Sequence, residues 1–277
     1  MGALLELALK RSIDAEATGA LVPLETELVP LPGSAPFLLR RLLSETPKHF
    51  FSARPKPNPF CPWEPALEVQ PVRDQHVLIL NKFPVQRGHL LLITRQWQPQ
   101  SGWLNHADWQ AVAEVEADTS GLWFFNSCAA AGASQPHRHL QLLPRHGQQI
   151  SCPLAPALCD QLARGERIWP WRYRLSERRC YGTKEAGEEL LELYSNHLEQ
   201  LGMGDVRQHD QPQRPYNLLM DRQWFMTVER VREHWAGFSI NALGYAGCLL
   251  ITEHSKQQWL IENGPMALLR AVAAPMR

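Results

Sequence analysis

The chain has 277 residues, of which 44% are hydrophobic and 20% charged, proportions that are ordinary for a globular protein. Lysine plus arginine and aspartate plus glutamate both number 28, so the formal net charge is zero and gives no reason to expect a nucleic acid or an acidic membrane as a partner. The six cysteines include no Cys-x-x-Cys pair, which predicts reduced thiols and neither a disulfide framework nor a zinc cage.

The N-terminal part of the chain predicts one helix and then an irregular stretch. Residues 3–17 favour a helix because leucines and alanines recur along one loose face. Glu6 and Lys10 interrupt this apolar stretch, so it does not resemble a secretory signal, and no segment approaches the roughly 18 apolar residues that cross a bilayer. We therefore expect a cytoplasmic protein. Residues 37–43 predict a strand, and the six prolines of residues 44–65 predict a long irregular segment of the kind that often binds a ligand.

The central and C-terminal parts predict alternating strands and helices. In the centre, apolar runs and a candidate N-cap predict strands over 77–80 and 90–93, a helix over 105–120 capped by Asn105, and strands over 122–125 and 137–143. In the last third, the patterns predict helices over 153–164, 184–201 and 257–272, and paired strands over 216–220 and 224–228. No linker rich in proline, glycine or serine divides the chain. We therefore expect a single domain over 1–277, with a core at about 45–150 and a completing segment at about 151–277.

One short motif carries most of the chemical information. On a strand, alternate side chains share a face, so His137, His139 and Gln141 point the same way. A loop of small residues, 132–136, precedes them and would allow backbone N–H groups to approach an anion. Two imidazoles and a carboxamide beside such a loop suit a histidine that attacks phosphorus while amides hold the phosphate oxygens.

The chemistry of each side chain suggests its role. His139 is the expected nucleophile, because an imidazole with a pKa near 6.5 offers a lone pair at neutral pH without a separate strong base. Gln141 is expected to donate its amide N–H to a phosphate oxygen, and it cannot lend a proton to a leaving group. His137 either supports His139, contacts phosphate or has a structural role. A glutamine as the third residue of this motif, where it cannot protonate a leaving group, favours transfer or phosphorolysis over hydrolysis.

The string from Phe125 to Gln141 resembles the nucleotidyltransferase branch of the histidine-triad superfamily, in which glutamine replaces the third histidine. Within that branch, the sequence Ala-Ser-Gln-Pro-His-x-His-Leu-Gln at 133–141 resembles that of the ATP adenylyltransferases, also called diadenosine tetraphosphate phosphorylases. The resemblance implies an α+β fold whose mainly antiparallel sheet is flanked by helices. It also implies that diadenosine tetraphosphate and phosphate give ATP and ADP through an adenylyl-His139 intermediate.

The resemblance also implies a set of substrate contacts. Asn81, Lys82 and His89 match the nucleoside-binding pair of strands, and Lys56 matches a lysine that approaches the polyphosphate. The residues expected to wrap the phosphates are Asn126, Ser127, Gly132, Ala133, Ser134 and Gln135. The family often has proline-arginine after the strand predicted at 224–228, where this chain has Glu229-Arg230, so the role of Arg230 is left open.

The partners expected from the resemblance are small molecules: diadenosine tetraphosphate, ATP, ADP and phosphate. A divalent cation such as Mg²⁺ is expected to accompany the polyphosphate, held mostly by phosphate oxygens and not by a protein cage. Three alternatives remain open at this stage. They are a uridylyltransferase acting on hexose 1-phosphates, a hydrolase, and a protein that binds dinucleoside polyphosphates without turnover. The sequence leaves the oligomeric state undecided.

Overall fold

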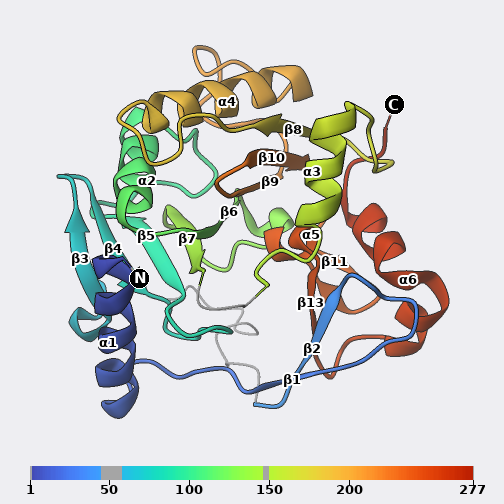
Figure 1. Ribbon diagram of the computed structural model, residues 1–277, viewed down its shortest axis with the longest axis horizontal. Helices are drawn as coiled ribbons and strands as arrows, with labels where there is room; N and C mark the ends of the chain where they lie inside the picture. The colour runs from blue at the N-terminus through green and yellow to red at the C-terminus, as the bar shows by residue number, and fades with distance from the viewer. Residues whose placement is uncertain (1, 45–57, 146–149, 277) are drawn as a thin grey trace.

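An eight-stranded sheet forms the centre of the computed structural model, which describes residues 2–44, 58–145 and 150–276 (Figure 1). The strands lie in the order β3-β4-β5-β7-β6-β9-β10-β8. Every neighbouring pair is antiparallel, so the mainly antiparallel sheet of the predicted α+β fold is confirmed. The strands are β3 (Glu68–Val72), β4 (His76–Leu80), β5 (Leu90–Thr94), β6 (Gly121–Asn126), β7 (His139–Pro144), β8 (Tyr173–Glu177), β9 (Tyr216–Met220) and β10 (Trp224–Glu229).

Helices cover both faces of this sheet. On one side lie α1 (Ala3–Ala17), α2 (His106–Asp118) and α4 (Ala186–Leu201), with α2 packed on α4. On the other side lie α3 (Ala155–Arg164), α5 (Ala242–Ala246) and α6 (Gln257–Val272), together with a small sheet of β1 (Thr26–Leu28), β2 (Leu38–Leu42) and β13 (Cys248–Ile251) (Figure 1). A two-stranded ribbon joins β11 (His234–Trp235) to β12 (Phe238–Ser239). Among the described residues, no helix is both long and apolar enough to cross a membrane.

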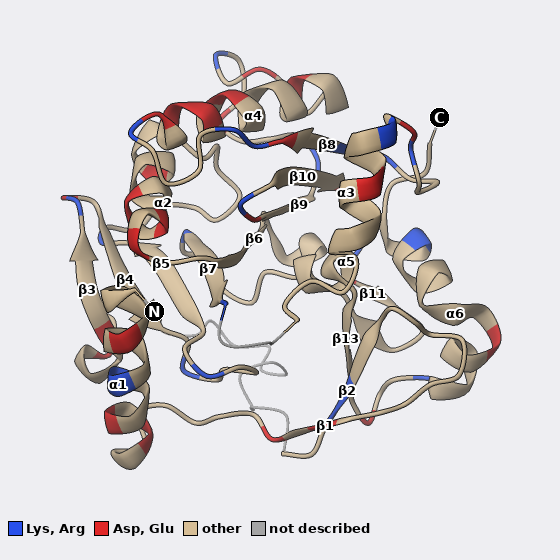
Figure 2. Ribbon diagram, viewed as in Figure 1, with Lys and Arg blue, Asp and Glu red and all other residues tan. Residues whose placement is uncertain are grey.

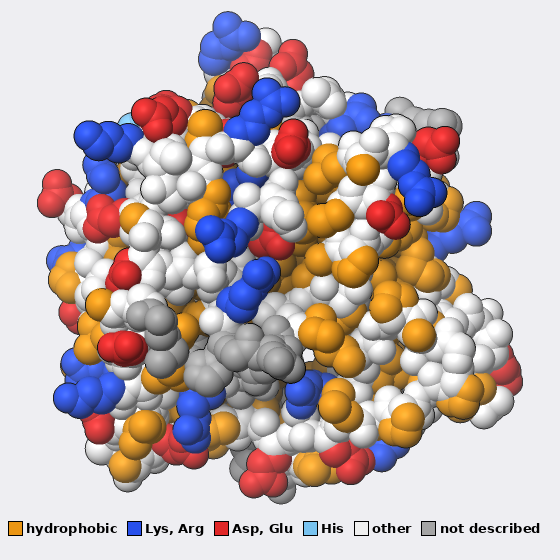
Figure 3. Space-filling view, in the orientation of Figure 1, with side chains coloured by type: hydrophobic (Ala, Val, Ile, Leu, Met, Phe, Trp, Pro, Cys, Tyr) orange, Lys and Arg blue, Asp and Glu red, His pale blue; other side chains and the backbone are white. Residues whose placement is uncertain are grey.

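The central strands separate two hydrophobic cores. Along β6, Trp123 and Phe125 pack into the core beneath α2 and α4, whereas Leu122 and Phe124 pack into the core shared with α5 and α6. Because both faces are buried, these strands read as continuous apolar runs and not as an alternating pattern. Charged residues are sparse on the central strands and frequent along α1, α2 and α4 (Figure 2). Hydrophobic side chains gather instead on the surface over α3 and the region beside it (Figure 3).

Most of the predicted elements are present, with shifted ends. The helix predicted over 3–17 is α1, and Asn105 caps α2 by accepting hydrogen bonds from the backbone N–H groups of Ala107 and Asp108. The strand predicted over 137–143 begins at His139, because His137 forms only an isolated bridge with Pro99. Most of the irregular segment predicted over 44–65 lies outside the described residues.

The other predicted elements correspond to β2, β4, β5, β6, α3, α4, β9, β10 and α6. The predicted pairings within the hairpins β4–β5 and β9–β10 are confirmed. Two strands of the central sheet, β3 and β8, were not predicted, and they form its two edges. The short strands β1, β11, β12 and β13 and the helix α5 were not predicted either. Pro71 in β3 and the charged residues of β8 weaken the apolar pattern there, as edge strands permit.

A buried ion pair attaches β8 and the segment after it to α2. The Arg178 guanidinium donates from both terminal nitrogens to the Glu116 carboxylate, at 2.8 Å each, and both side chains are fully buried. Arg178 also donates to the carbonyl oxygen of Asp221 at 2.9 Å. Burial raises the pKa of Glu116, and the Arg178 guanidinium opposes that shift. The pair therefore links the last turn of α2 to the segment after β8.

We expect Glu116→Gln to lower the free energy of unfolding by ~3 kcal/mol, because it leaves the buried Arg178 charge with only the more distant Glu189 carboxylate, 3.8 Å from Nε. The double variant Glu116→Leu/Arg178→Met, which removes both charges, should be less destabilised than the single one. Urea denaturation followed by fluorescence measures both values. A single variant within ~0.5 kcal/mol of the unsubstituted protein would show that the pair does not hold α2 in place.

Candidate functional site

The predicted motif lies at the start of β7, where this strand runs between β5 and β6. The Phe60 ring contacts both imidazoles, with ring centroids 5.7 Å from His137 and 5.3 Å from His139. The Arg138 side chain points to the opposite face, where it donates to the Asp108 carboxylate of α2 at 3.0 Å. The two histidines therefore share one face of the strand, as the sequence predicted.

The His139 imidazole is held in one tautomer by its own backbone. Its Nδ1 lies 2.8 Å from the carbonyl oxygen of His137, an acceptor that can only receive a hydrogen bond. The proton therefore sits on Nδ1, and Nε2 keeps its lone pair. Burial lowers the pKa of His139 to about 4, so the ring is neutral at pH 7. A neutral imidazole with an unprotonated Nε2 is the form needed for nucleophilic attack.

His137 is fully buried and engaged at both ring nitrogens. Its Nε2 lies 2.8 Å from the Thr94 carbonyl oxygen, and its Nδ1 lies 2.8 Å from the Asn58 side-chain nitrogen. Nε2–H therefore donates to Thr94, and Nδ1 accepts from Asn58. These two bonds hold His137, whose carbonyl oxygen accepts the hydrogen bond from His139 Nδ1–H. Of the predicted alternatives, this geometry corresponds to support of His139.

A line of hydrogen bonds connects Asn81, His89 and Gln141. The Asn81 side chain accepts from the backbone N–H of Phe83 at 3.0 Å, so its NH₂ group is the one that faces His89 Nδ1, at 3.2 Å. His89 Nε2–H then donates to the Gln141 side-chain oxygen at 3.0 Å. Burial lowers the pKa of His89 to about 4, so this ring is neutral as well. The line fixes which end of the Gln141 amide is the donor.

Gln100, which the sequence analysis did not single out, joins the ends of β6 and β7. Its side-chain oxygen accepts from the backbone N–H of His139 at 2.8 Å. Its side-chain nitrogen donates to the carbonyl oxygens of Asn126 and His139, at 2.8 and 3.2 Å. Gln100 is almost fully buried. It therefore fixes the position of the His139 backbone relative to the end of β6.

The residues that enter the β6–β7 loop (residues 127–138) are held by β9. The buried Asn126 side-chain oxygen accepts from Asn217 at 2.8 Å and from the backbone N–H of Ala242 at 2.9 Å. Ser127 Oγ accepts from the backbone N–H of Tyr216 at 2.9 Å. In this structure both side chains hold the loop, and the phosphate contacts expected of them stay a prediction.

The rest of the loop differs in exposure. Gly132 adopts φ +89°, and a Cβ on it would lie 2.8 Å from the Asn241 Cα, so only glycine fits there. Ala133 and Gln135 are half-buried and Ser134 is exposed. At the β4–β5 turn Lys82 is also exposed, with its Nζ 5.9 Å from the Phe83 ring centroid. Lys56 lies outside the described residues.

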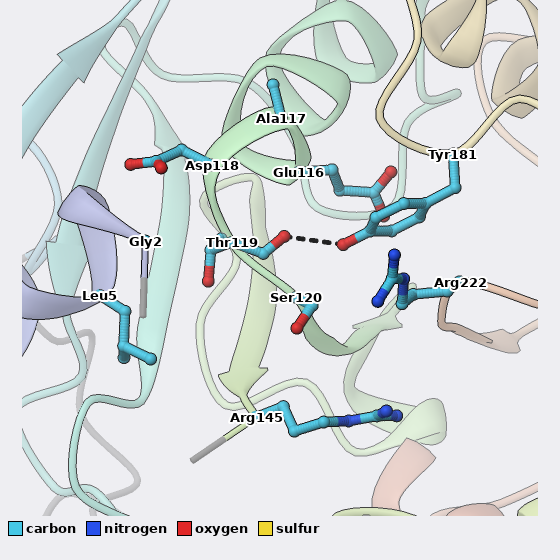
Figure 4. Close-up of a pocket in the computed structure, with 10 residues that line it drawn as sticks. All are labelled: Gly2, Leu5, Glu116, Ala117, Asp118, Thr119, Ser120, Arg145, Tyr181 and Arg222. Carbon is cyan, nitrogen blue, oxygen red and sulfur yellow. Dashed lines mark hydrogen bonds between the residues drawn. The ribbon is translucent and has the colours of Figure 1, made fainter. Parts of the chain in front are cut away.

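A separate polar cavity of about 400 Å³ lies at the far ends of β6 and β7 and contains none of the predicted site residues (Figure 4). The last turn of α2 lines it, with Glu116 and Asp118, and the Tyr181 hydroxyl donates to the Thr119 carbonyl oxygen at 2.7 Å. Arg145 and Arg222 complete the lining. None of His137, His139 and Gln141 reaches this cavity, so we do not place the site there. The described residues include no cluster of three or more His, Cys, Asp or Glu side chains suited to a metal.

Comparisons with known proteins agree with the motif. The sequence model of the Ap4A phosphorylase N-terminal domain matches residues 1–160, and that of the ATP adenylyltransferase C-terminal domain matches residues 168–275. Two relatives from Saccharomyces cerevisiae are each 25% identical to the chain. Diadenosine 5',5'''-P1,P4-tetraphosphate phosphorylase 2 aligns over 68% of this chain and 66% of its own length, and Protein APA1 over 62% and 60%.

Solved structures share the fold. The crystal structure of yeast Ap4A phosphorylase Apa2 in complex with AMP superposes with a TM-score of 0.76 at 21% identity. The structure of Apa2 in complex with Ap4A superposes with a TM-score of 0.75 at 20% identity. Each comparison covers 99% of this chain and 98% of the other. The likeness therefore extends over the whole described fold.

The buried histidines predict how stability depends on pH. His139 and His89 have pKa values of about 4 in the folded protein, against 6.5 for an ordinary histidine. Between pH 6.5 and about 4 the unfolded chain binds protons that the folded one excludes, so stability falls there by up to ~1.4 kcal/mol per pH unit for each histidine. Above pH 6.5 both states are neutral, and the full stability is present.

Urea unfolding at pH 7.5, 5.5 and 4.5 measures this loss in the unsubstituted protein and in His139→Gln. The variant lacks one buried titrating group, so its stability should decline less steeply, by ~1 kcal/mol per pH unit. Equal declines in the two proteins would mean that the His139 imidazole titrates normally in the fold.

Proposed function

The chain belongs to the Ap4A phosphorylase and ATP adenylyltransferase family, and from this premise we propose that it converts diadenosine tetraphosphate (Ap4A) and phosphate into ATP and ADP. The observation that carries the proposal is the His139 imidazole, neutral at pH 7 and with Nε2 as its free lone pair. The yeast relative named as a tetraphosphate phosphorylase is aligned over 66% of its own length and Protein APA1 over 60%, so the chemistry of the site supplies the rest of the argument.

The proposed reaction has two displacements at one phosphorus. His139 Nε2 attacks the α-phosphorus of one adenosine half of Ap4A, the new P–N bond forms, and the bond to the bridging oxygen breaks, so that ATP leaves with the electron pair. The imidazole then carries a positive charge, which the His137 carbonyl oxygen stabilises through Nδ1–H. An oxygen of inorganic phosphate next attacks the same phosphorus, the P–N bond breaks, and ADP leaves while His139 returns to neutral.

Gln141 suits this reaction as a donor of fixed direction. Because its side-chain oxygen is occupied by His89, its NH₂ group is the end that can donate to a non-bridging phosphate oxygen. An amide has no proton to give to a leaving group, and ATP leaves as a polyphosphate anion that needs little protonation. This arrangement favours transfer to phosphate over hydrolysis.

The remaining parts of the proposal concern substrate and setting. The exposed Ser134 and Lys82 and the half-buried Gln135 would contact the polyphosphate, as would Lys56. Mg²⁺ would bind to the phosphate oxygens of the nucleotide, because oxygen atoms are the ligands that it prefers. All six cysteines are free thiols, and this supports a cytoplasmic setting.

Purified protein incubated with Ap4A and Mg²⁺ should form ATP and ADP only when inorganic phosphate is added. His139→Ala should lose at least about 1000-fold in turnover, because no other group offers the attacking lone pair. The exposed His234 provides the matched control, and His234→Ala should keep full activity. Nucleotide separation measures the products. Products without phosphate would indicate a hydrolase, and turnover by His139→Ala would refute the mechanism.

His89→Ala should lower kcat/KM by about 10-fold, because the Gln141 amide becomes free to rotate. This is the effect expected for the loss of one hydrogen bond. The double variant His89→Ala/Gln141→Ala should then be no slower than Gln141→Ala alone. His197, a buried histidine bonded to Ser176 and Thr227, provides the control. His197→Ala should lose stability without losing kcat/KM. Additive effects of the two substitutions would exclude the orienting role of His89.

A further inference from the structure

Arg230, which follows β10, is a buried cation with every hydrogen-bond donor in use. Its side chain is almost completely buried. A guanidinium has five N–H donors, and here they meet five oxygen atoms. Nε donates to the Val272 carbonyl oxygen at 3.1 Å. One terminal nitrogen donates to the Asn217 side-chain oxygen and to the Ala131 carbonyl oxygen. The other terminal nitrogen donates to the carbonyl oxygens of Arg232 and Ile240, at 2.8 Å each.

None of these five acceptors is a carboxylate, and Arg230 makes no ion pair within the described part of the chain. The neighbouring Glu229 is neutralised by Arg172 and Arg214, at 2.6 and 2.7 Å. Burial lowers the pKa of Arg230, and Tyr245 and Glu233 oppose that shift. An arginine nevertheless stays protonated at neutral pH. The fold therefore keeps an unpaired positive charge at a buried position, where a neutral side chain would avoid the cost of desolvation.

The bonds of Arg230 converge on the β6–β7 loop. The Ala131 carbonyl oxygen lies in the short helical turn of that loop, and it also accepts from Asn217 at 2.8 Å. Asn217 in turn donates to the Asn126 side chain, where the loop begins. The Ile240 carbonyl oxygen, a further acceptor of Arg230, lies 3.0 Å from where a Cβ of Gly132 would be. One guanidinium thus ties the loop to β9, to the segment before α5 and to the last residue of α6.

We propose that Arg230 is the positioning residue of the β6–β7 loop: it holds the loop in the conformation that binds phosphate groups, and its unpaired charge favours an anionic ligand there. The inference rests on the proposed function for the identity of that ligand, a nucleoside polyphosphate. Arg230 acts through Ala131 and Asn217 and does not touch the substrate. This is the role that the sequence analysis left open for Arg230.

The experiment compares Arg230→Met and Arg230→Lys with Arg178→Met, a substitution at an equally buried arginine that contacts no part of the loop. Three quantities are measured for each protein: the melting temperature, kcat and KM for Ap4A with phosphate, and the dissociation constants of inorganic triphosphate and of adenosine. Arg230→Met should lose about 100-fold in kcat/KM, because a shifted loop misplaces the phosphates. Its affinity for triphosphate should fall by about 10-fold while its affinity for adenosine stays unchanged.

Arg230→Lys keeps the charge and should recover part of the triphosphate affinity. Arg178→Met should melt earlier but keep kcat/KM and both dissociation constants. Equal losses of triphosphate and adenosine binding, or equal kinetic losses in Arg178→Met, would overturn the proposal and leave Arg230 as a packing residue. If Arg230→Met does not fold, Asn217→Ala removes the acceptor through which Arg230 acts and the two bonds from Asn217 to Ala131 and Asn126. It should lose triphosphate affinity selectively, and unchanged affinity would again overturn the proposal.

The two proposals can fail separately. If the unsubstituted protein binds inorganic triphosphate but does not turn over Ap4A, the proposed function fails, and the comparison of triphosphate affinities still decides the role of Arg230. If turnover occurs and Arg230→Met matches the unsubstituted protein in every measurement, the inference about Arg230 fails and the proposed function stands.

Discussion

The candidate site depends on one hydrogen bond, from Nδ1 of His139 to the carbonyl oxygen of His137. The bond selects the tautomer, so it decides which nitrogen has the lone pair, and it stabilises the charge that would develop on attack. It works only if the peptide between the two histidines does not rotate. That peptide is held from two directions, by Asn58 and Thr94 on the His137 ring and by Gln100 on the His139 backbone. Several polar residues thus serve a single donor–acceptor pair.

Burial contributes to the site in a second way. The strands around His139 are covered on both faces, and removal of water lowers the pKa values of His139 and His89 to about 4. Both rings therefore stay neutral over the whole physiological range. A neutral His139 can attack phosphorus, and a neutral His89 keeps one donor and one acceptor, so it can transmit the orientation of Asn81 to Gln141. The same desolvation that costs stability in acid keeps the chemistry available at pH 7.

The sequence was sufficient for features that depend on local pattern. Strand periodicity placed His137 and His139 on one face, and a single polar residue, Asn105, identified the start of α2. Features that depend on distant contacts could not be predicted. Gln100 acts on residues 26 and 39 positions away, and Asn217 on one 91 positions away, so neither has a local signature. Asn126 and Ser127 were assigned to phosphate binding by resemblance, and that assignment stays a prediction; the hydrogen bonds of their side chains to β9 had no local signature.

These distant contacts also explain why the two matched segments of the chain act as one unit at the site. The motif belongs to the segment at 1–160, yet the loop before it is fixed by Asn217 and Arg230 from the segment at 168–275. β9 of the second segment pairs directly with β6 of the first, so the sheet carries no boundary between them. The second segment contacts the loop at Ala131 and at its start, Asn126, through the Asn217 and Arg230 side chains. In the proposed mechanism the first segment supplies the nucleophile, and the second holds the loop beside it through Asn217 and Arg230.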